Sequence, residues 1–186
     1  MDWDPAKHPR DPDDGRFTDS WVGAALRRMR LPSWIEKVTP EQAETIRAGL
    51  AGEDKARRYM RLALTDTGHG GQYDAVTHVA RDERGQVVAA VSTRAYQQWT
   101  EESDSLVPLT GIDYLGSVAP GGGTALVRNT VLRAWEAGHV GVYLEPGEGS
   151  LGFWEKLGFT PDPLEFGTDA HYGLTADQFE QWLAEH

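Results

Sequence analysis

A run of three glycines and a threonine, Gly121-Gly122-Gly123-Thr124, stands between an expected strand and an expected helix. Without Cβ atoms, the amides of such a loop can approach an anion closely, and the start of a helix carries roughly half a positive charge. The spacing does not fit a dinucleotide fingerprint, and no Lys-Ser or Lys-Thr pair follows as a P-loop requires. The loop is therefore a candidate phosphate site, with a plain flexible turn as the alternative.

Two carboxylates, Asp113 and Glu145, stand at the ends of expected strands on either side of this loop. A carboxylate at such a position could act as a general base that takes a proton from an ammonium group. The alternative for each is a solvated or hydrogen-bonded carboxylate. The six histidines have no metal-ligand spacing, so no metal site is expected. The absence of cysteine excludes a Cys nucleophile and an S-acyl intermediate on the protein.

The net charge of −11 would repel a phosphate backbone, so nucleic acid is not expected as a partner. No apolar run approaches the roughly 18 to 20 residues that a membrane span needs, and the N-terminus does not resemble a signal peptide. A length of 186 residues favours one domain plus an arm. We therefore expect a cytoplasmic protein without a membrane partner.

Glycine and proline punctuation divides the chain after residue 30 into short elements. The pattern Thr39-Pro40-Glu41-Gln42 predicts a capping box, and Thr175 with Gln178 predicts another. Residues 97–106, with Glu101, Glu102 and Asp104, are expected to form a polar loop. The expected strands are 34–38, 74–80, 86–92, 109–118 and 140–144, and the expected helices run from Pro40 to Gly52, over 56–64, from the glycine loop to about 137, over 150–157, and from Thr175 onward.

Two spaced motifs resemble the GNAT N-acetyltransferase superfamily. Tyr114-Leu115-Gly116-Ser117-Val118, followed by the glycines and Thr124-Ala125-Leu126, is similar to the family's fourth strand, glycine turn and helix start. Val142-Tyr143-Leu144-Glu145, followed by Phe153-Trp154-Glu155-Lys156-Leu157-Gly158-Phe159, is similar to its later strand and short aromatic helix. The resemblance implies an α+β (α/β) fold over residues 31–186, with a mixed, mainly antiparallel central sheet flanked by helices.

The same resemblance implies acetyl-CoA as co-substrate, bound where the strands ending near Val118 and Leu144 splay apart. Backbone groups of Ser117 and Val118 would pair with the pantetheine arm. An amine acceptor would attack the thioester directly, without an acyl-enzyme. The pyrophosphate would lie on the loop and the helix start, formed by Gly121, Gly122, Gly123, Thr124 and Ala125, with Arg128 as an additional contact.

The sequence departs from the family at two polar positions. Trp154 stands where the family often has a tyrosine that protonates the departing thiolate, and Pro146-Gly147-Glu148-Gly149 stands where an asparagine is usual. An indole cannot deliver a proton usefully. Tyr143 and Tyr172 are candidate substitutes for the missing acid, with core packing as the alternative for each.

Residues 1–30 are expected to form an irregular arm anchored by Trp3, Phe17 and Trp21. The stretch from Lys7 to Thr18 resembles short arms of bacteriophage head-associated proteins, which implies a phage or prophage origin and attachment to a virion, with a generic polar tail as the alternative. The arm could also dock on its own domain or on another copy of the chain. The sequence thus supports two functions, a CoA-dependent N-acyltransferase or a virion-associated structural or assembly protein that keeps the same fold without catalysis.

Overall fold

A computed structural model of the chain describes residues 34–66, 75–100, 105–163 and 171–186. The arm with Trp3, Phe17 and Trp21, and the acidic residues Glu101, Glu102 and Asp104, lie outside the described residues. In chain order the elements are β1 (Ile35–Lys37), α2 (Pro40–Gly49), α3 (Lys55–Thr65), β2 (Val76–Arg81), β3 (Val87–Thr100), β4 (Ser105–Ser117), α4 (Gly122–Glu136), β5 (Gly141–Leu144), α5 (Leu151–Lys156), β6 (Thr160–Pro161), β7 (Tyr172–Thr175) and α6 (Ala176–Glu185).

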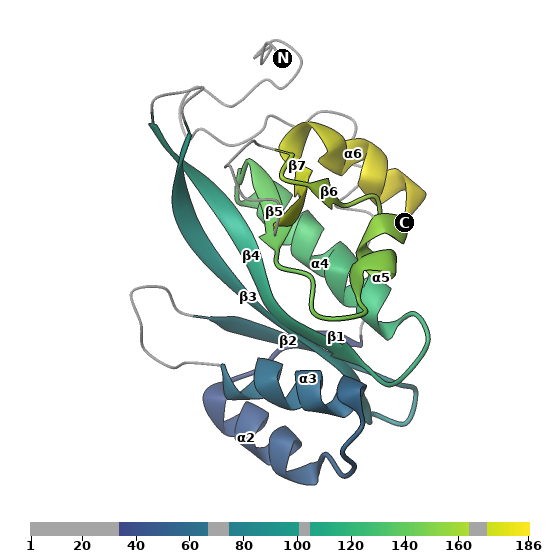
Figure 1. The fold of residues 1–186 in the computed structure, drawn as a ribbon. Helices are drawn as coiled ribbons and strands as arrows, with labels where there is room; N and C mark the ends of the chain where they lie inside the picture. The colour runs from purple at the N-terminus through teal and green to yellow at the C-terminus, as the bar shows by residue number, and fades with distance from the viewer. Residues whose placement is uncertain (1–33, 67–74, 101–104, 164–170) are drawn as a thin grey trace.

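The described strands form one sheet in the order β1-β2-β3-β4-β5-β7-β6 (Figure 1). Every neighbouring pair is antiparallel except β4 and β5, which run parallel. The parallel pair needs a crossover, and α4 supplies it. The predicted mixed, mainly antiparallel sheet flanked by helices is confirmed.

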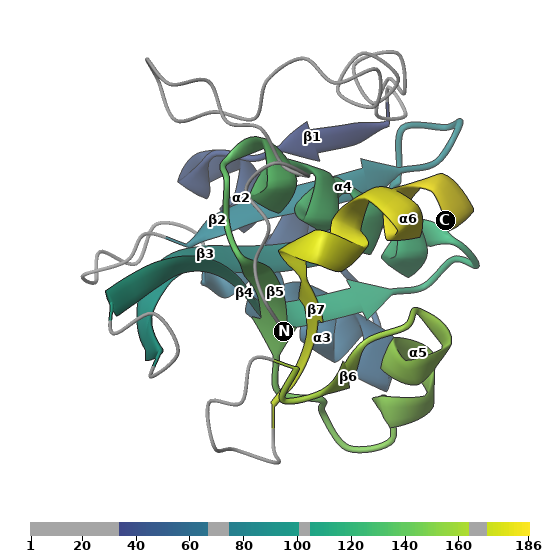
Figure 2. The same ribbon diagram turned by 90° about the horizontal axis from the view of Figure 1, so that it is seen from above.

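Helices cover both faces of the sheet (Figures 1 and 2). Because side chains alternate along a strand, neighbouring residues enter different cores. Val79 and Ala90 pack with the buried residues of α2 and α3. Ala80, Ala89 and Val91 pack on the opposite face with residues of α4 and α6. The sheet is therefore the middle layer of a three-layer structure.

Several local signals in the sequence are confirmed. Thr39 accepts from the Gln42 amide while the Gln42 side chain accepts from the Thr39 amide, which is a complete capping box. Thr175 and Gln178 form the second one. Gly158 has φ +77° and follows α5, and the Phe159 amide donates to the Trp154 carbonyl at 3.1 Å. This is the Schellman ending that the Gly158-Phe159 step predicts.

Two boundaries were predicted wrongly. The expected loop over 97–106 is a hairpin arm instead, because β3 continues to Thr100 and β4 begins at Ser105. Its polar residues do not prevent pairing, since both faces of a projecting ribbon can meet water. Helix α2 ends at Gly49 rather than at Gly52, which lies beyond the C-cap with φ +101°.

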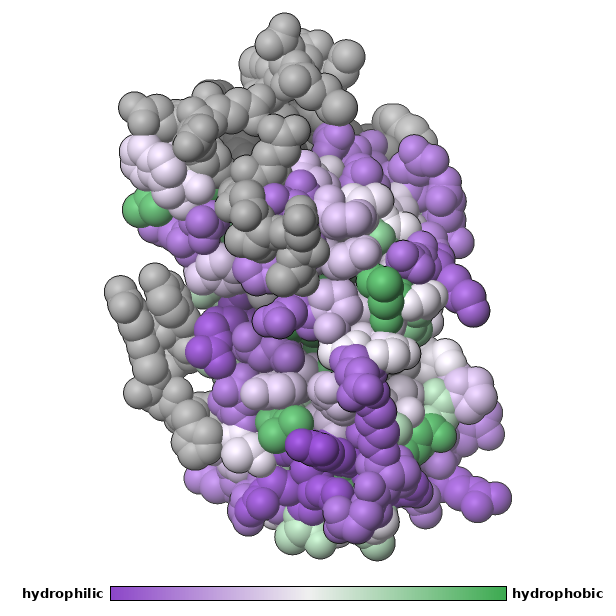
Figure 3. All heavy atoms as spheres, in the orientation of Figure 1, coloured by the Kyte–Doolittle hydropathy of each residue, from purple (hydrophilic) through white to green (hydrophobic). Residues whose placement is uncertain are grey.

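The hairpin arm carries an exposed apolar pair. β3 and β4 extend together beyond the rest of the sheet (Figure 1). Near their far end Trp99 pairs with Leu106, and these residues are 50% and 57% exposed. The face drawn in Figure 3 is mostly hydrophilic over α2 and α3. Within the described residues, no helix has the length and apolar character needed to cross a membrane.

Candidate functional site

The site begins where β4 separates from β5. Their pairing stops at Ile112 and Leu144. On the other side of β4, Ser92 pairs with Tyr114 and Thr93 with Ile112, which leaves Asp113 as an extra residue in the ladder. An extra residue of this kind is a β-bulge, which bends its strand and redirects side chains. The bulge therefore lies at the point where the two strands splay.

At its end, β4 is hydrogen-bonded to β3 along one edge, and its other edge faces the splay. The Val118 amide donates to the Val88 carbonyl of β3 at 2.9 Å, so it is committed to the sheet. Backbone groups of successive strand residues point in opposite directions, so those of Ser117 point away from β3. The Ser117 hydroxyl donates to the Ala119 carbonyl at 2.8 Å and tightens the turn into the glycine loop.

The three glycines of the loop have different roles. Gly121 is the N-cap of α4 and has φ +78°, a conformation that other residues adopt at a cost. Gly122 is buried, and a Cβ there would lie 2.8 Å from the Ser117 hydroxyl oxygen and 3.2 Å from the Ala89 Cβ. A Cβ on Gly123 would meet Phe153 at an ordinary 3.6 Å. Gly122 thus packs the helix against the sheet, while Gly121 and Gly123 border the open side.

The start of α4 leaves backbone donors unused. The first intrahelical bond runs from the Ala125 amide to the Gly121 carbonyl at 2.9 Å. The preceding amides of a helix have no partner within it. Those of Gly123 and Thr124 therefore remain as donors beside the open side, where both residues line a cavity.

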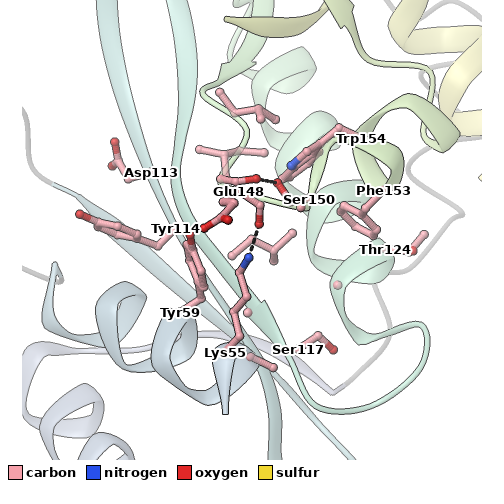
Figure 4. Close-up of a pocket in the computed structure, with 18 of the residues that line it drawn as sticks. Lys55, Tyr59, Asp113, Tyr114, Ser117, Thr124, Glu148, Ser150, Phe153 and Trp154 are labelled. Atoms are coloured by element: carbon pink, nitrogen blue, oxygen red, sulfur yellow. Dashed lines mark hydrogen bonds between the residues drawn. The ribbon is translucent and has the colours of Figure 1, made fainter. Parts of the chain in front are cut away.

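That cavity, of about 460 Å³, occupies the splay (Figure 4). Its walls come from the N-terminal part of α3, the end of β4, the glycine loop, the loop after β5 and α5. The described lining residues are Lys55, Ala56, Tyr59, Ile112, Asp113, Tyr114, Leu115, Gly116, Ser117, Ala119, Gly121, Gly123, Thr124, Leu144, Glu145, Gly147, Glu148, Gly149, Ser150, Phe153 and Trp154.

The structure brings six of the predicted site residues to this cavity and places four elsewhere. Asp113, Glu145, Ser117, Gly121, Gly123 and Thr124 are in its lining. Val118, Gly122, Ala125 and Arg128 are not among the described lining residues. Arg128 is directed to α6, where its Nη2 donates to the Leu183 carbonyl at 3.3 Å.

Helix α3 contributes residues that the sequence analysis did not assign to a site. The Lys55 ammonium donates to the Glu148 carbonyl, so it bridges α3 and the loop after β5. Tyr59, one turn later, points toward that loop (Figure 4), and its hydroxyl would lie 2.5 Å from a Cβ built on Gly147. The spacing of Lys55 and Tyr59 is the only sequence signal for this shared face. The helical spacing of Ala56, Tyr59 and Met60 in the expected helix over 56–64 instead favours a buried face.

Asp113 is held by an ion pair on β3. The Arg94 Nε donates to the Asp113 carboxylate at 3.1 Å, and the Arg94 Nη2 donates to both oxygens of Asp66 at 3.1 Å. Burial raises the pKa of Asp113, Arg94 opposes that rise, and the Asp66 carboxylate adds to it. Glu145 is exposed at the edge of the cavity. Asp113 is likewise an exposed residue, and its ion pair with Arg94 distinguishes it from Glu145.

The tyrosines near the site are not the ones expected. Tyr143 is buried, with its ring 2.8 Å from a Cβ built on Gly173. Tyr172 is partly buried and packs against the core cluster that contains Leu144 and Trp154. Neither is among the described lining residues, whereas Tyr59 and Tyr114 are. Trp154 is buried and lines the cavity, in edge contact with Phe153 and Phe159.

Metal-binding groups do not gather in the described part of the chain. No three His, Asp or Glu side chains there lie together in a way that could hold a metal ion. The polar groups of the described cavity lining include backbone amides, carboxylates, one ammonium group and phenols.

Comparison with known proteins gives matches in structure alone. No protein-family model matches the sequence, and no curated protein does. A point mutant of the AtaT toxin bound to acetyl-CoA and the C-terminus of antitoxin AtaR is 17% identical, with a TM-score of 0.59, covering 81% of this chain and 97% of that one. AtaT complexed with acetyl-methionyl-tRNAfMet is 15% identical, with a TM-score of 0.56, covering 79% of this chain and 96% of that one. A KacTA–DNA complex is 18% identical, with a TM-score of 0.55, covering 73% of this chain and 87% of that one.

The aligned regions cover most of this chain and nearly the whole length of the two AtaT chains. At sequence identities below one fifth, structural similarity establishes the fold but not the activity, which must be argued from the residues of the site. The chain therefore has a GNAT-like fold, as its two sequence motifs predict.

Proposed function

We propose that the protein is a CoA-dependent N-acyltransferase that moves the acetyl group of acetyl-CoA to an amine. The observation that carries the proposal is the cavity at the splay, bordered by the unused amides of Gly123 and Thr124 and by two carboxylates. Amides at a helix start suit the pyrophosphate. Carboxylates at the other side suit proton removal from the acceptor.

In this proposal the acceptor nitrogen attacks the thioester carbonyl carbon, the C–S bond breaks, and CoA leaves as a thiolate. The acceptor first loses its ammonium proton to Asp113 or Glu145. The nitrogen loses a second proton as the amide forms, and this proton balances the one that the thiolate takes up. The thiolate then needs a proton, and the hydroxyls of Tyr59 and Tyr114 are the acids that line the cavity. Tyr59 is the stronger candidate because it points toward the loop after β5, whereas Tyr114 points away from it (Figure 4).

An acceptor without a phosphate backbone is part of the proposal. The net charge of −11 disfavours a polyanion. One structural neighbour is complexed with acetyl-methionyl-tRNAfMet and another with DNA, so nucleic acid is the comparison to make. Small amines and aminoacyl-tRNA should be offered in parallel, with acetyl transfer to the small amines expected. Transfer to aminoacyl-tRNA alone would contradict this part.

Calorimetric titration with acetyl-CoA and CoA tests the proposal. Wild-type protein should bind both, and Gly123→Asp should lose binding, because its carboxylate would stand among the amides meant for phosphate. Gly152→Asp is the matched control, since Gly152 is exposed on α5 and a Cβ there meets nothing within 4 Å. No heat from wild type at millimolar acetyl-CoA, or equal affinity in the two variants, would contradict the proposal.

A non-catalytic, virion-associated protein is the second candidate, favoured by Trp154 in place of an acidic hydroxyl. The phage-like motif that suggests it, Lys7 to Thr18, lies outside the described residues. Released CoA separates the two functions, and because the chain has no cysteine a thiol reagent reports CoA alone. Acetyl-CoA binding without CoA release on any amine, together with co-sedimentation with phage particles that is lost on deleting residues 1–30, would favour the second candidate.

A further inference from the structure

Asp113 has a supporting array that reaches beyond the cavity. It is the bulged residue of β4, so it makes no ladder pair with β3. A bulged side chain is free of the strict alternation of its strand, and another contact must hold its direction. Arg94 provides that contact from β3, at 3.1 Å.

The same guanidinium is shared with a second carboxylate. Arg94 Nη2 lies 3.1 Å from Asp66, the C-cap of α3, while its Nε serves Asp113. The side chains are 35%, 18% and 30% exposed for Arg94, Asp66 and Asp113. Such partial burial weakens screening by salt compared with a pair on open surface. One positive charge therefore stands between two negative charges, and Asp66 both competes for Arg94 and repels Asp113.

We propose that Arg94 and Asp66 are positioning residues that orient Asp113 at the bulge and set the pH at which it loses its proton. The catalytic consequence rests on the proposed acetyltransferase function, because only then does Asp113 act as a base. A base whose pKa lies close to the working pH is the most effective. Burial and Asp66 raise the pKa of Asp113, and Arg94 limits the rise.

Other titratable groups also lie near this array. Tyr96 of β3 is close enough for the Asp113 charge to raise its pKa, burial being the larger cause. Tyr114 follows Asp113 on β4. Lys55, Tyr59, Glu145 and Glu148 share the cavity. Among the described residues, Arg94 is the ion-pair partner of Asp113, so its removal should change the pKa of Asp113 most.

The proposal predicts opposite shifts from two substitutions. Arg94→Gln removes the counter-ion and should raise the pKa of Asp113 by about one unit. Asp66→Asn removes the like charge and frees Arg94 for Asp113, so it should lower that pKa by a similar amount. Arg94→Lys keeps the charge and should restore most of the wild-type value. A loss of packing alone would not give shifts of opposite sign.

Carbon-13 NMR titration of the Asp113 carboxyl in the full-length protein measures the shifts without using activity. Arg81→Gln is the matched control, because Arg81 pairs with Glu36 at 2.7 Å on β2, away from the cavity lining, and should leave Asp113 unchanged. Shifts of the same sign, or no shift, in the Arg94→Gln and Asp66→Asn proteins would overturn the proposal.

The pH dependence of kcat/KM for acetyl transfer supplies the functional readout. Its acidic limb should move up in pH for Arg94→Gln and down for Asp66→Asn. A limb that stays fixed while the carboxyl titration moves would overturn the assignment of Asp113 as the base. Absence of turnover in wild type would count against the proposed function, and the carboxyl titration would still decide the array.

Discussion

Gly116 of β4 lies directly against Ala56 of α3, and a Cβ atom on Gly116 would stand 2.4 Å from the Ala56 carbonyl oxygen. The Met60 amide nitrogen would be 2.5 Å away. Both are backbone atoms, so the side chain cannot turn aside to make room. The close approach places α3, with Lys55 and Tyr59, over the end of β4.

Gly116→Ala should therefore push α3 away from the sheet and lower the free energy of unfolding by about 1–3 kcal/mol, as overpacking does. Acetyl-CoA affinity should fall as well, because α3 forms one wall of the cavity. Urea unfolding and calorimetry measure the two effects. Gly49→Ala is the control, because a Cβ there meets nothing within 4 Å. Equal stability of the two variants would refute the close-packing argument.

Two glycines of the same short segment should respond to alanine in opposite directions. Gly158 follows α5 with φ +77°, so Gly158→Ala should cost about 1 kcal/mol of unfolding free energy. Gly152 lies within α5 and is exposed, so Gly152→Ala should gain about 0.5–1 kcal/mol through helix propensity. Thermal or urea unfolding of the two proteins checks the sign. A stabilised Gly158→Ala protein would contradict the left-handed C-cap.

Lys55 is the one cation among the described residues that line the cavity, where Asp113, Glu145 and Glu148 are the anions. We expect Lys55→Ala to weaken acetyl-CoA binding about fivefold to tenfold and to reduce its salt dependence, because phosphate loses a positive partner. Arg58→Ala removes a cation from the same helix outside the lining and should change affinity little. Equal weakening in both variants would mean a general charge effect.

His78 makes stability depend on pH. Burial, then the charges of Arg133 and Lys37, lower its pKa to about 4. The unfolded chain therefore binds a proton between pH of about 6.5 and about 4 that the folded chain refuses, so stability falls as the pH drops through this range. The loss attributable to His78 is at most about 3 kcal/mol.

Urea unfolding at several pH values between 7 and 4.5, for wild type and for His78→Gln, isolates that loss. The variant should show a shallower decline. His139, whose pKa burial also lowers, contributes equally to both proteins and drops out of the difference. Parallel declines would show that His78 is not the group responsible.

Local backbone signals predicted most of the fold. Capping residues such as Thr39 and turn glycines such as Gly158 act through neighbours a few positions away, so the sequence alone reveals them. The extension of β3 to Thr100 was missed because the residues that form it are largely polar. They still form a strand, because they pair with β4 in a part of the hairpin that projects beyond the other strands. Such pairing depends on the tertiary position of the ribbon, which periodicity does not encode.

The candidate site was predicted along β4 and the glycine loop, and missed along α3 and β3. Ser117, Gly121 and Gly123 were predicted from motifs that are contiguous in sequence, and all three line the cavity. Arg94 and Asp66 join Asp113 only because strand pairing and helix packing bring together residues 19 and 28 positions from Arg94. Arg128 has a charge suited to phosphate, but its place on α4 directs it toward α6.

Because Asp113 is an extra, unpaired residue, the shape of β4 at the splay depends on the number of residues in the strand as well as on their types. Side chains alternate between the two faces of a strand, and the extra residue places Ile112 and Tyr114, two positions apart in sequence, on opposite faces opposite Thr93 and Ser92. Deleting Asp113 would make Ile112 and Tyr114 adjacent in a regular ladder opposite Thr93 and Ser92. Ser117 would stay opposite Ala89, and the bend that the bulge gives β4 at the splay would be lost. A homologous chain that differs by a single insertion or deletion here would form its splay differently, even if every other residue were the same.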